Sequence, residues 1–262
     1  PVDYGFYNGV PAIQRNAYGG GEGGAIYGTT YLTLNNGYIG YVHLNANETL
    51  NEQGKIVAAT SPMEERYAAK VDDDTYWVND VWSGANRLKD SGNLFGGGYD
   101  VLISVDFSNV KMWNGVVRNS LVGGGEIATI GRGAIEASGP SNAVRSLKAI
   151  YKAGKTNVEM FNGHVERNVF GGGKGYNIFG YGQQGTLYMD GYVFGQTEVH
   201  IHGGEVGTDE GLAEGYGNVF GGGDIGYVYS PSVNSSKTKQ KNATGRVELE
   251  DGAEGYLVAV AV

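Results

Sequence analysis

The chain has 262 residues, of which 47 are glycine, 5 are proline and none is cysteine. This composition excludes collagen, which needs glycine at every third position with far more proline, and it excludes disulfide frameworks and thiolate chemistry. A net charge of −9 offers no basic face to a nucleic-acid partner, while 40% hydrophobic residues and 19 tyrosines argue against disorder. No apolar window approaches about eighteen residues, so we expect no membrane span.

Along the chain, a short apolar segment closed by three glycines recurs at 17–23, 93–100, 120–127, 168–175 and 218–225. The residues before this segment also repeat, because "VKMWNGVVRNSLVGGG" (110–125) aligns without a gap with "VEMFNGHVERNVFGGG" (158–173). The same beginning occurs at 32–39, 199–206 and 247–258. Internal repetition of this kind is typical of solenoids and propellers.

The repeated unit predicts short strands joined by glycine-containing corners. Val110 and Met112 alternate with polar residues, which is the pattern of a strand with one buried face. Asn114 and Gly115 stand where the chain must turn, since both residue types tolerate positive φ. The least interrupted unit is 27 residues long, whereas a propeller blade needs about 40. We therefore predict an all-β chain that forms a single domain over residues 1–262, a right-handed parallel β-helix (β-solenoid) of about five coils.

The glycine triplets look at first like phosphate-binding loops, but their context does not fit one. Residues of mixed charge follow them, namely Glu22, Tyr99, Glu126, Lys174 and Asp224. A phosphate loop needs a cation at this position, and the P-loop pattern also needs Ser or Thr where this chain has Gly175. We interpret the triplets as structural: either stacked backbones pass too close for side chains, or φ must be positive. They are Gly19, Gly20, Gly21, Gly96, Gly97, Gly98, Gly123, Gly124, Gly125, Gly171, Gly172, Gly173, Gly221, Gly222 and Gly223.

Residues between the inward-facing ones should form outward columns on the stacked strands. The first column is Thr33, Lys111, Glu159, His200 and Glu248, and its charges alternate along most of its length. The second column is Asn35, Trp113, Phe161, His202 and Glu250.

Two candidate sites arise from these columns. Trp113 and Phe161 form either a binding platform for sugar rings or a partner protein, or an aromatic ladder that only stabilises the sheet. Four side chains on the same face could hold a surface divalent metal, or could form a charge ladder without one: His200, His202, Glu248 and Glu250. We expect no other cofactor.

Insertions interrupt the repeat at about 41–92, 137–156, 207–217 and 230–244. Two of them carry helix signals. Ser61, Pro62 and Glu64 read as the start of a short helix, and the segment 141–154 has apolar residues at helical spacing before a glycine. We expect short helices there and loops elsewhere, and we expect specificity to lie in the insertions.

An enzyme on this scaffold is the alternative function, since polysaccharide lyases and glycosidases also use β-helices. Such enzymes need convergent carboxylates, or a base beside a charge-neutralising group. The candidates Asp100, Asp106, Asp190, Glu205 and Asp224 form no cluster by spacing, so we name no catalytic residue.

The "NVFGGG" units, separated by strand and turn segments, resemble the glycine-rich repeats of large adhesin-like surface proteins, notably from Bacteroidota. In style they are also similar to autotransporter passenger β-helices. This resemblance implies an extracellular or cell-surface location and a non-enzymatic structural or adhesive role, as a stalk, filament segment or adhesin. As a partner we expect a glycan or a host or cell-surface protein. The apolar ending "GYLVAVAV" (255–262) further predicts a longer parent chain or end-to-end contact with other subunits.

Overall fold

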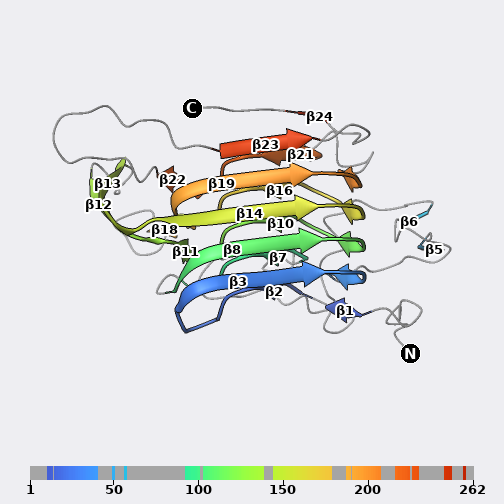
Figure 1. Ribbon diagram of the computed structural model, residues 1–262, viewed down its shortest axis with the longest axis horizontal. Helices are drawn as coiled ribbons and strands as arrows, with labels where there is room; N and C mark the ends of the chain where they lie inside the picture. Colours follow the sequence, from blue (N-terminus) through green and yellow to red (C-terminus); the bar gives the residue numbers. More distant parts are fainter. Residues whose placement is uncertain are drawn as a thin grey trace.

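The computed structural model describes residues 11–13, 15–40, 49–50, 56–57, 92–100, 103–138, 144–178, 187–189, 191–207, 216–224, 226–229, 245–249 and 256–257. Within these ranges the secondary structure is all β, and no helix occurs. Most of the strands lie in three parallel sheets, which we call A, B and C (Figure 1). No helix of the described residues is long and apolar enough to cross a membrane.

Sheets A and B consist of very short strands. Sheet A has the order β1 (Ala12–Ile13), β4 (Tyr38–Ile39), β9 (Val116–Val117), β15 (His164–Val165) and β20 (Glu205–Val206). Sheet B has the order β2 (Ala17–Tyr18), β7 (Leu94–Phe95), β10 (Leu121–Val122), β16 (Val169–Phe170), β21 (Asn218–Phe220) and β24 (Tyr256–Leu257). Each glycine triplet therefore directly follows a strand of sheet B.

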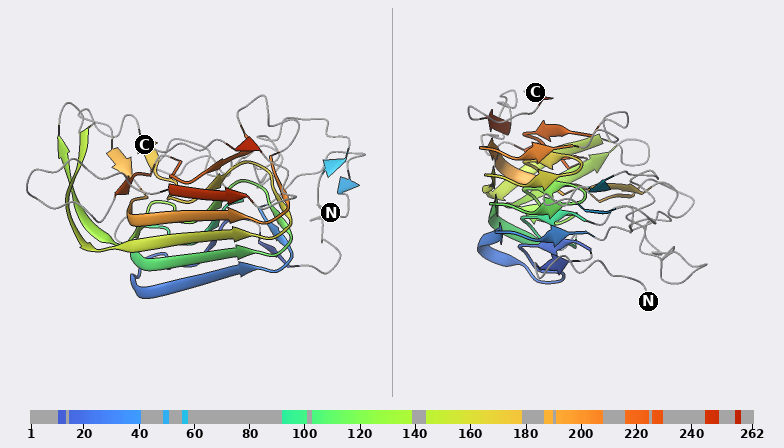
Figure 2. Two further views of the ribbon diagram at one scale, coloured as in Figure 1. Left: turned by 45° about the horizontal axis from the view of Figure 1, so that its top comes forward. Right: turned by 90° about the vertical axis from the view of Figure 1, so that its right-hand side faces the viewer.

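Sheet C contains the long strands, which lie side by side along one face (Figure 2). Its main path is β3 (Ile26–Leu34), β8 (Ser104–Met112), β14 (Gly154–Met160), β19 (Val193–Ile201) and β23 (Gly245–Leu249). Two shorter strands also pair in this sheet, β11 (Thr129–Ile130) with β8 and β19, and β22 (Val228–Tyr229) with β19.

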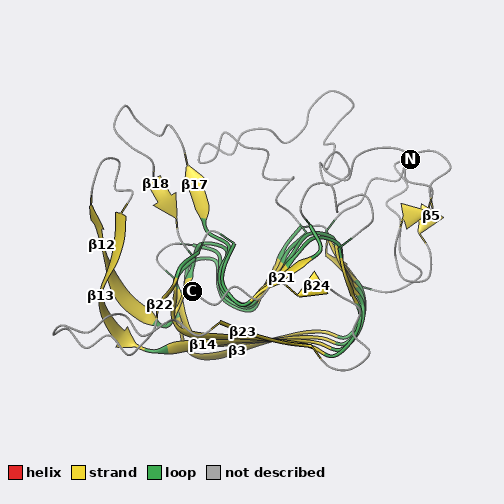
Figure 3. Cartoon of the chain, turned by 90° about the horizontal axis from the view of Figure 1, so that it is seen from above, coloured by secondary structure: helices red, strands yellow, loops and turns green. Residues whose placement is uncertain are grey.

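The chain visits the three sheets in a repeating order. From β8 it runs to β9 in sheet A and β10 in sheet B, and it returns to sheet C at β11 and β14. The same order recurs from β14 through β15 and β16, and from β19 through β20 and β21. We call one such passage a level. Seen from above, the strands of successive levels superpose (Figure 3).

The register between levels is the one that the sequence repeat predicts. Val158 pairs with Val110 on one side and with Val199 on the other, and Val199 pairs in turn with Val247. Leu32 extends this file at β3. Because side chains alternate along a strand, this register sends the same repeat positions inward at every level.

The inward positions of the three sheets form the main core. Val110, Val158 and Val199 are completely buried and contact residues from sheets A and B in the same cluster. Burying a side chain of this size contributes about 1.5–3 kcal/mol. The cluster comprises Leu34, Ile39, Leu94, Val110, Met112, Val117, Leu121, Val158, Met160, Val165, Val169, Val199, Ile201 and Val219.

The glycine triplets lie where the backbones of adjacent levels meet directly. The amide of Gly97 donates to the carbonyl of Gly124 at 3.0 Å, and the amide of Gly124 donates to the carbonyl of Gly172 at 2.9 Å. A Cβ added to Gly124 would lie 2.7 Å from Gly173 Cα, closer than real Cβ contacts. The triplet glycines do not have positive φ, whereas Gly115 in its corner has a φ of 104°. Close approach therefore accounts for the triplets at 19–21, 96–98, 123–125 and 171–173, and positive φ accounts for the corner.

Buried hydroxyl groups tie sheet C to the first glycine of the triplets. Thr30 Oγ1 donates to the carbonyl of Gly96 at 2.7 Å, and Thr156 Oγ1 donates to the carbonyl of Gly171 at 2.6 Å. Ser108 and Thr197 make the equivalent bonds at their own levels. A buried carbonyl without a partner would cost about 1–3 kcal/mol, so these bonds hold the two sheets together across the core.

Asparagine side chains form a ladder of hydrogen bonds between levels, at the residue that precedes the apolar pair of each sheet B strand. Asn16 Oδ1 accepts the backbone amide of Asn93 at 2.9 Å, and Asn168 Oδ1 accepts that of Asn218 at 2.9 Å. Asn93 Oδ1 accepts the amide of Ser120 at 3.2 Å. This explains why Asn precedes the apolar pair in most repeats.

The helix expected at 141–154 is wrong. The segment is instead β13 (Val144–Lys152), which pairs antiparallel with β12 (Arg132–Ser138). The hairpin begins before the insertion expected at 137–156, and residues 154–156 already belong to β14. Register shifts leave Lys148 and Tyr151 without a partner in β12. Because the pairing skips Lys148, Leu147 and Ile150 are three residues apart in the sequence but pair with Ile135 and Gly133, which are two apart, so this part of the strand takes on a helix-like spacing.

A second antiparallel hairpin, β17 (Tyr176–Ile178) with β18 (Leu187–Met189), is not anticipated by the sequence analysis. Both hairpins project from the stacked levels, as does the small pair β5 (Thr49–Leu50) and β6 (Ile56–Val57) (Figure 3). The helix expected at Ser61 and the insertion at 230–244 lie outside the described residues, as do most of 41–92 and 208–215 of the insertion at 207–217.

The triplets provide a matched test of close backbone approach. We expect Gly124→Ala to lower the free energy of unfolding by about 1–3 kcal/mol, because its Cβ would collide with the backbone of Gly173. In Gly222→Ala the new Cβ would meet no described atom within 4 Å, so its effect should stay within about 0.5 kcal/mol. Urea denaturation followed by circular dichroism measures both, and equal midpoints would contradict this account.

Candidate functional site

The outer face of sheet C is the candidate functional surface. Its strands are the longest of the stacked levels, and it faces the viewer in Figure 1. Alternation sends every second residue of β3, β8, β14 and β19 to this side, so equivalent outward residues lie next to one another across the levels. The residues of the first expected column lie next to one another on adjacent strands, since Glu159 pairs with Lys111 and with His200.

Trp113 and Phe161 stack face to face at the ends of β8 and β14. Their ring centroids are 4.0 Å apart with an angle of 10° between the planes. His202 continues the stack on the other side of Phe161, with centroids 4.5 Å apart and an angle of 7°. Both faces of Phe161 are therefore covered by neighbouring rings. Because a sugar ring stacks on an open aromatic face, this geometry favours the stabilising ladder at Phe161, whereas Trp113 at the end of the stack stays 47% exposed.

The charged side chains of this face form pairs between levels. Lys111 Nζ lies 2.6 Å from Glu159 Oε2, and Lys155 Nζ lies 2.6 Å from Glu198 Oε2. The hydrogen bond from Lys155, and then the charge of Lys155, lower the pKa of Glu198 below its ordinary value. His200 contributes to the same shift from 3.8 Å. The pairs are partly exposed, so each contributes at most about 1 kcal/mol.

A shallow depression of about 410 Å³ lies on this face. Residues of four strands line it, among them Tyr31, Phe107, Asn109, Lys155, Asn157 and Glu198. Tyr31 is 77% exposed, whereas the ring of Phe107 lies under Lys152 Nζ, 5.4 Å from the ring centroid. The depression therefore combines amides, an open aromatic ring and paired charges.

The four residues of the candidate metal site are brought together only in part. His200 and His202 have ring centroids 6.3 Å apart, and the backbone of Glu248 pairs with that of His200. The side chain of Glu248 and the whole of Glu250 lie outside the described residues. Among the residues that are described, no three His, Asp or Glu side chains gather closely enough to hold a metal ion. The divalent metal stays a prediction.

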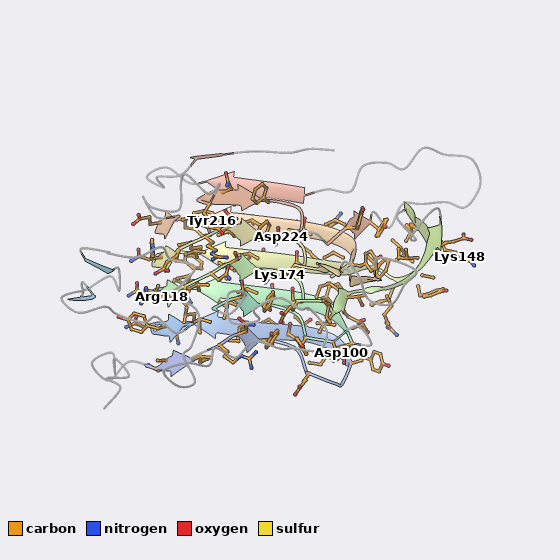
Figure 4. All side chains as sticks on the ribbon, turned by 180° about the vertical axis from the view of Figure 1, so that it is seen from behind. Asp100, Arg118, Lys148, Lys174, Tyr216 and Asp224 are labelled. Atoms are coloured by element: carbon orange, nitrogen blue, oxygen red, sulfur yellow. The ribbon has the colours of Figure 1, made fainter. Side chains whose placement is uncertain are left out.

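The acidic candidates for catalysis are distributed over different sheets. Asp106 in sheet C lies 3.4 Å from Arg132, and Glu205 in sheet A lies 3.7 Å from His164. Asp100 and Asp224 follow triplets of sheet B at different levels, which Figure 4 shows from behind. Asp190 lies outside the described residues.

Two buried polar contacts were not foreseen from the sequence. Arg118 forms a fully buried ion pair with Glu166, between sheets A and B. Tyr18 donates a hydrogen bond to Glu126, and burial, followed by the charge of Glu126, raises the pKa of Tyr18 above its ordinary range. The gapless alignment of the two best repeats already places Arg118 opposite Glu166, so the first contact had a signal in the sequence.

Of the residues that line the depression, the sequence columns included Glu159, His200 and His202 but missed the rest. The columns considered from the sequence begin at Thr33 and Asn35, whereas the depression centres on the column two residues earlier. That column contains Tyr31, Asn109, Asn157, Glu198 and Arg246 in direct backbone register. Extending the repeat alignment by two residues would have found it.

Comparison of the chain with protein families, curated proteins and solved structures gives no match.

The Lys155–Glu198 pair predicts a specific pH dependence. Because the pKa of Glu198 is lowered in the folded chain, the pair stabilises the fold above the pKa of the unfolded chain and loses this contribution as pH falls. We expect Lys155→Gln to raise the pKa of Glu198 toward 4.5, measured by carboxyl NMR titration. Lys148→Gln, in the hairpin, should leave it unchanged. An unaltered pKa in Lys155→Gln would show that another group causes the shift.

Proposed function

We propose that the three sheets are the walls of a right-handed parallel β-helix that serves as a non-enzymatic structural or adhesive module outside the cell. The observation that carries this proposal is the common register of sheet C, where equivalent residues of β3, β8, β14, β19 and β23 pair with one another. Right-handedness rests on a general rule, since crossover connections between parallel strands of one sheet are almost always right-handed. Together these features support a β-solenoid.

A binding or structural role is favoured over catalysis by the charges of the outer face. A general acid needs a pKa near the working pH, whereas the pKa of Glu198 is lowered by Lys155. The carboxylate of Glu159 also pairs with a lysine. Paired charges of this kind keep a surface soluble and orient side chains, which suits recognition of a partner.

An extracellular position and end-to-end assembly are parts of the same proposal. The glycine-rich repeats resemble those of adhesin-like surface proteins, which supports the location. Strand β3 pairs with β8 on one side, and no strand of the described residues pairs with its other edge. Such an edge can accept a further strand from another subunit or from further repeats.

Retention without turnover distinguishes the adhesive role from the enzymatic alternative. We expect beads coated with the full 262-residue chain to be retained on at least one of cellulose, xylan, mannan, pectin and hyaluronan. The supernatant should contain no new reducing ends and no unsaturated sugars. Beads coated with urea-unfolded chain are the control. Release of either product would replace this proposal with a glycosidase or a polysaccharide lyase.

Immunoelectron microscopy of intact source cells tests location and assembly together. We expect label at the outer surface, spaced along threads longer than a single chain, because stacked ends extend the solenoid. Label confined to the cell interior would refute the surface role, and isolated surface particles of single-chain size would refute end-to-end assembly.

A further inference from the structure

We infer that the depression on the outer face of sheet C binds a neutral saccharide, which the amides of Asn109 and Asn157 hold from below. This inference names a ligand class for the adhesive surface proposed above and rests on that proposal.

The depression exists because short residues stand among long ones. Asn109 and Asn157 pair directly across β8 and β14, and each is flanked on its own strand by longer side chains. Phe107 and Lys155 stand on one side of them, and Lys111 and Glu159 stand on the other. Two adjacent asparagines thus leave a hollow of about 410 Å³. This volume is at the lower end of the range for small-molecule sites, about 300–1,000 Å³, and suits one or two sugar rings.

The floor of the depression offers hydrogen-bonding groups that the protein does not use. Within the described part of the chain, no side-chain hydrogen bond occupies the amide of Asn109 or Asn157. Each amide has two N–H donors and one carbonyl acceptor. Adjacent strands are about 4.8 Å apart, so both amides can reach hydroxyl groups of the same ring or of two linked rings. Neighbouring sugar hydroxyls, which donate and accept at once, match this arrangement.

The charges around the floor favour a neutral ligand. Lys155 is paired with Glu198, and Glu159 is paired with Lys111, each at 2.6 Å. These two lysines are thus already compensated, and a sulfate or a uronic acid would have to displace a carboxylate to bind them, whereas Lys152, whose Nζ lies 5.4 Å from the ring centroid of Phe107, stands outside these pairs. The carboxylates keep lone pairs that accept hydrogen bonds from sugar hydroxyls.

Tyr31 supplies the apolar contact that saccharide sites usually include. Its side chain is 77% exposed at the end of the depression, next to Asn109 in the register. His202 also lines the depression, and it belongs to the stack in which both faces of Phe161 are covered by Trp113 and His202. Among the described residues that line the depression, Tyr31 is therefore the most exposed aromatic ring, able to contact the C–H face of a sugar.

Titration calorimetry on the full chain tests the inference with defined probes: lactose, maltose, cellobiose and N-acetylglucosamine as neutral sugars, and galacturonic acid as the anionic one. We expect millimolar or tighter binding of at least one neutral probe and no comparable binding of galacturonic acid. Asn109→Ala and Asn157→Ala should each weaken that binding at least tenfold, and Tyr31→Ala should weaken it severalfold.

Gln196→Ala is the matched control, because this exposed amide lies on the same face next to Lys155 but does not line the depression. Its affinity should stay within twofold of the original chain. Circular dichroism and the urea midpoint verify folding, and Asn157→Ser replaces any alanine variant that does not fold. Binding of only galacturonic acid, no binding of the neutral probes, or undiminished binding by the asparagine variants would overturn the inference.

The two proposals fail in different ways. If coated beads are retained on a polysaccharide but the asparagine variants bind like the original chain, only the saccharide site is wrong. If products are released while binding still depends on Asn109 and Asn157, the non-enzymatic role is wrong and the site remains.

Discussion

Backbone hydrogen bonds between levels are the constraint on which the rest of the structure depends. They place each residue of a strand directly against its equivalent in the next level, as Val158 lies between Val110 and Val199. A side chain must therefore be compatible with copies of its own position. Small residues allow close backbone contact at Gly124, hydroxyls such as that of Thr156 satisfy buried carbonyls, and flat rings stack at Phe161. These requirements explain why the same residue types recur at equivalent positions of the repeat.

The same constraint explains where insertions are tolerated. The hairpin of β12 and β13 interrupts a strand of sheet C, yet β11 before it and β14 after it both pair with β8 and β19. The insertion leaves the sheet and returns without changing the register. The stacked levels can thus carry variable segments at one end of sheet C while the outer face between them stays regular. A regular face on a rigid stack is well suited to present a binding surface, which links the fold to the proposed adhesive role.

Local patterns predicted much of this fold. Alternation can be read along a single strand, and the register between strands follows from aligning the repeats. The alternation at Val110 and Met112, the turn at Asn114 and Gly115 and the file of valines are all present as expected. The helix at 141–154 failed partly for a local reason, since the register shift at Lys148 gives Leu147 and Ile150 the three-residue spacing of a helix. In the candidate site, the sequence identified the face and the aromatic column, but not the depression beside them.

By itself, then, the amino-acid sequence determined the all-β class, the pairing of equivalent positions and the structural use of the glycines, because each depends on residues that recur at fixed spacing. Only the tertiary structure decided which outward groups remain available. The closed stack at Phe161, the buried pair of Arg118 with Glu166 and the hollow above Asn109 and Asn157 depend on side-chain directions and on the lengths of neighbours in other levels. These contacts form only when distant segments of the chain pack together, so the spacing of residues along the sequence does not predict them.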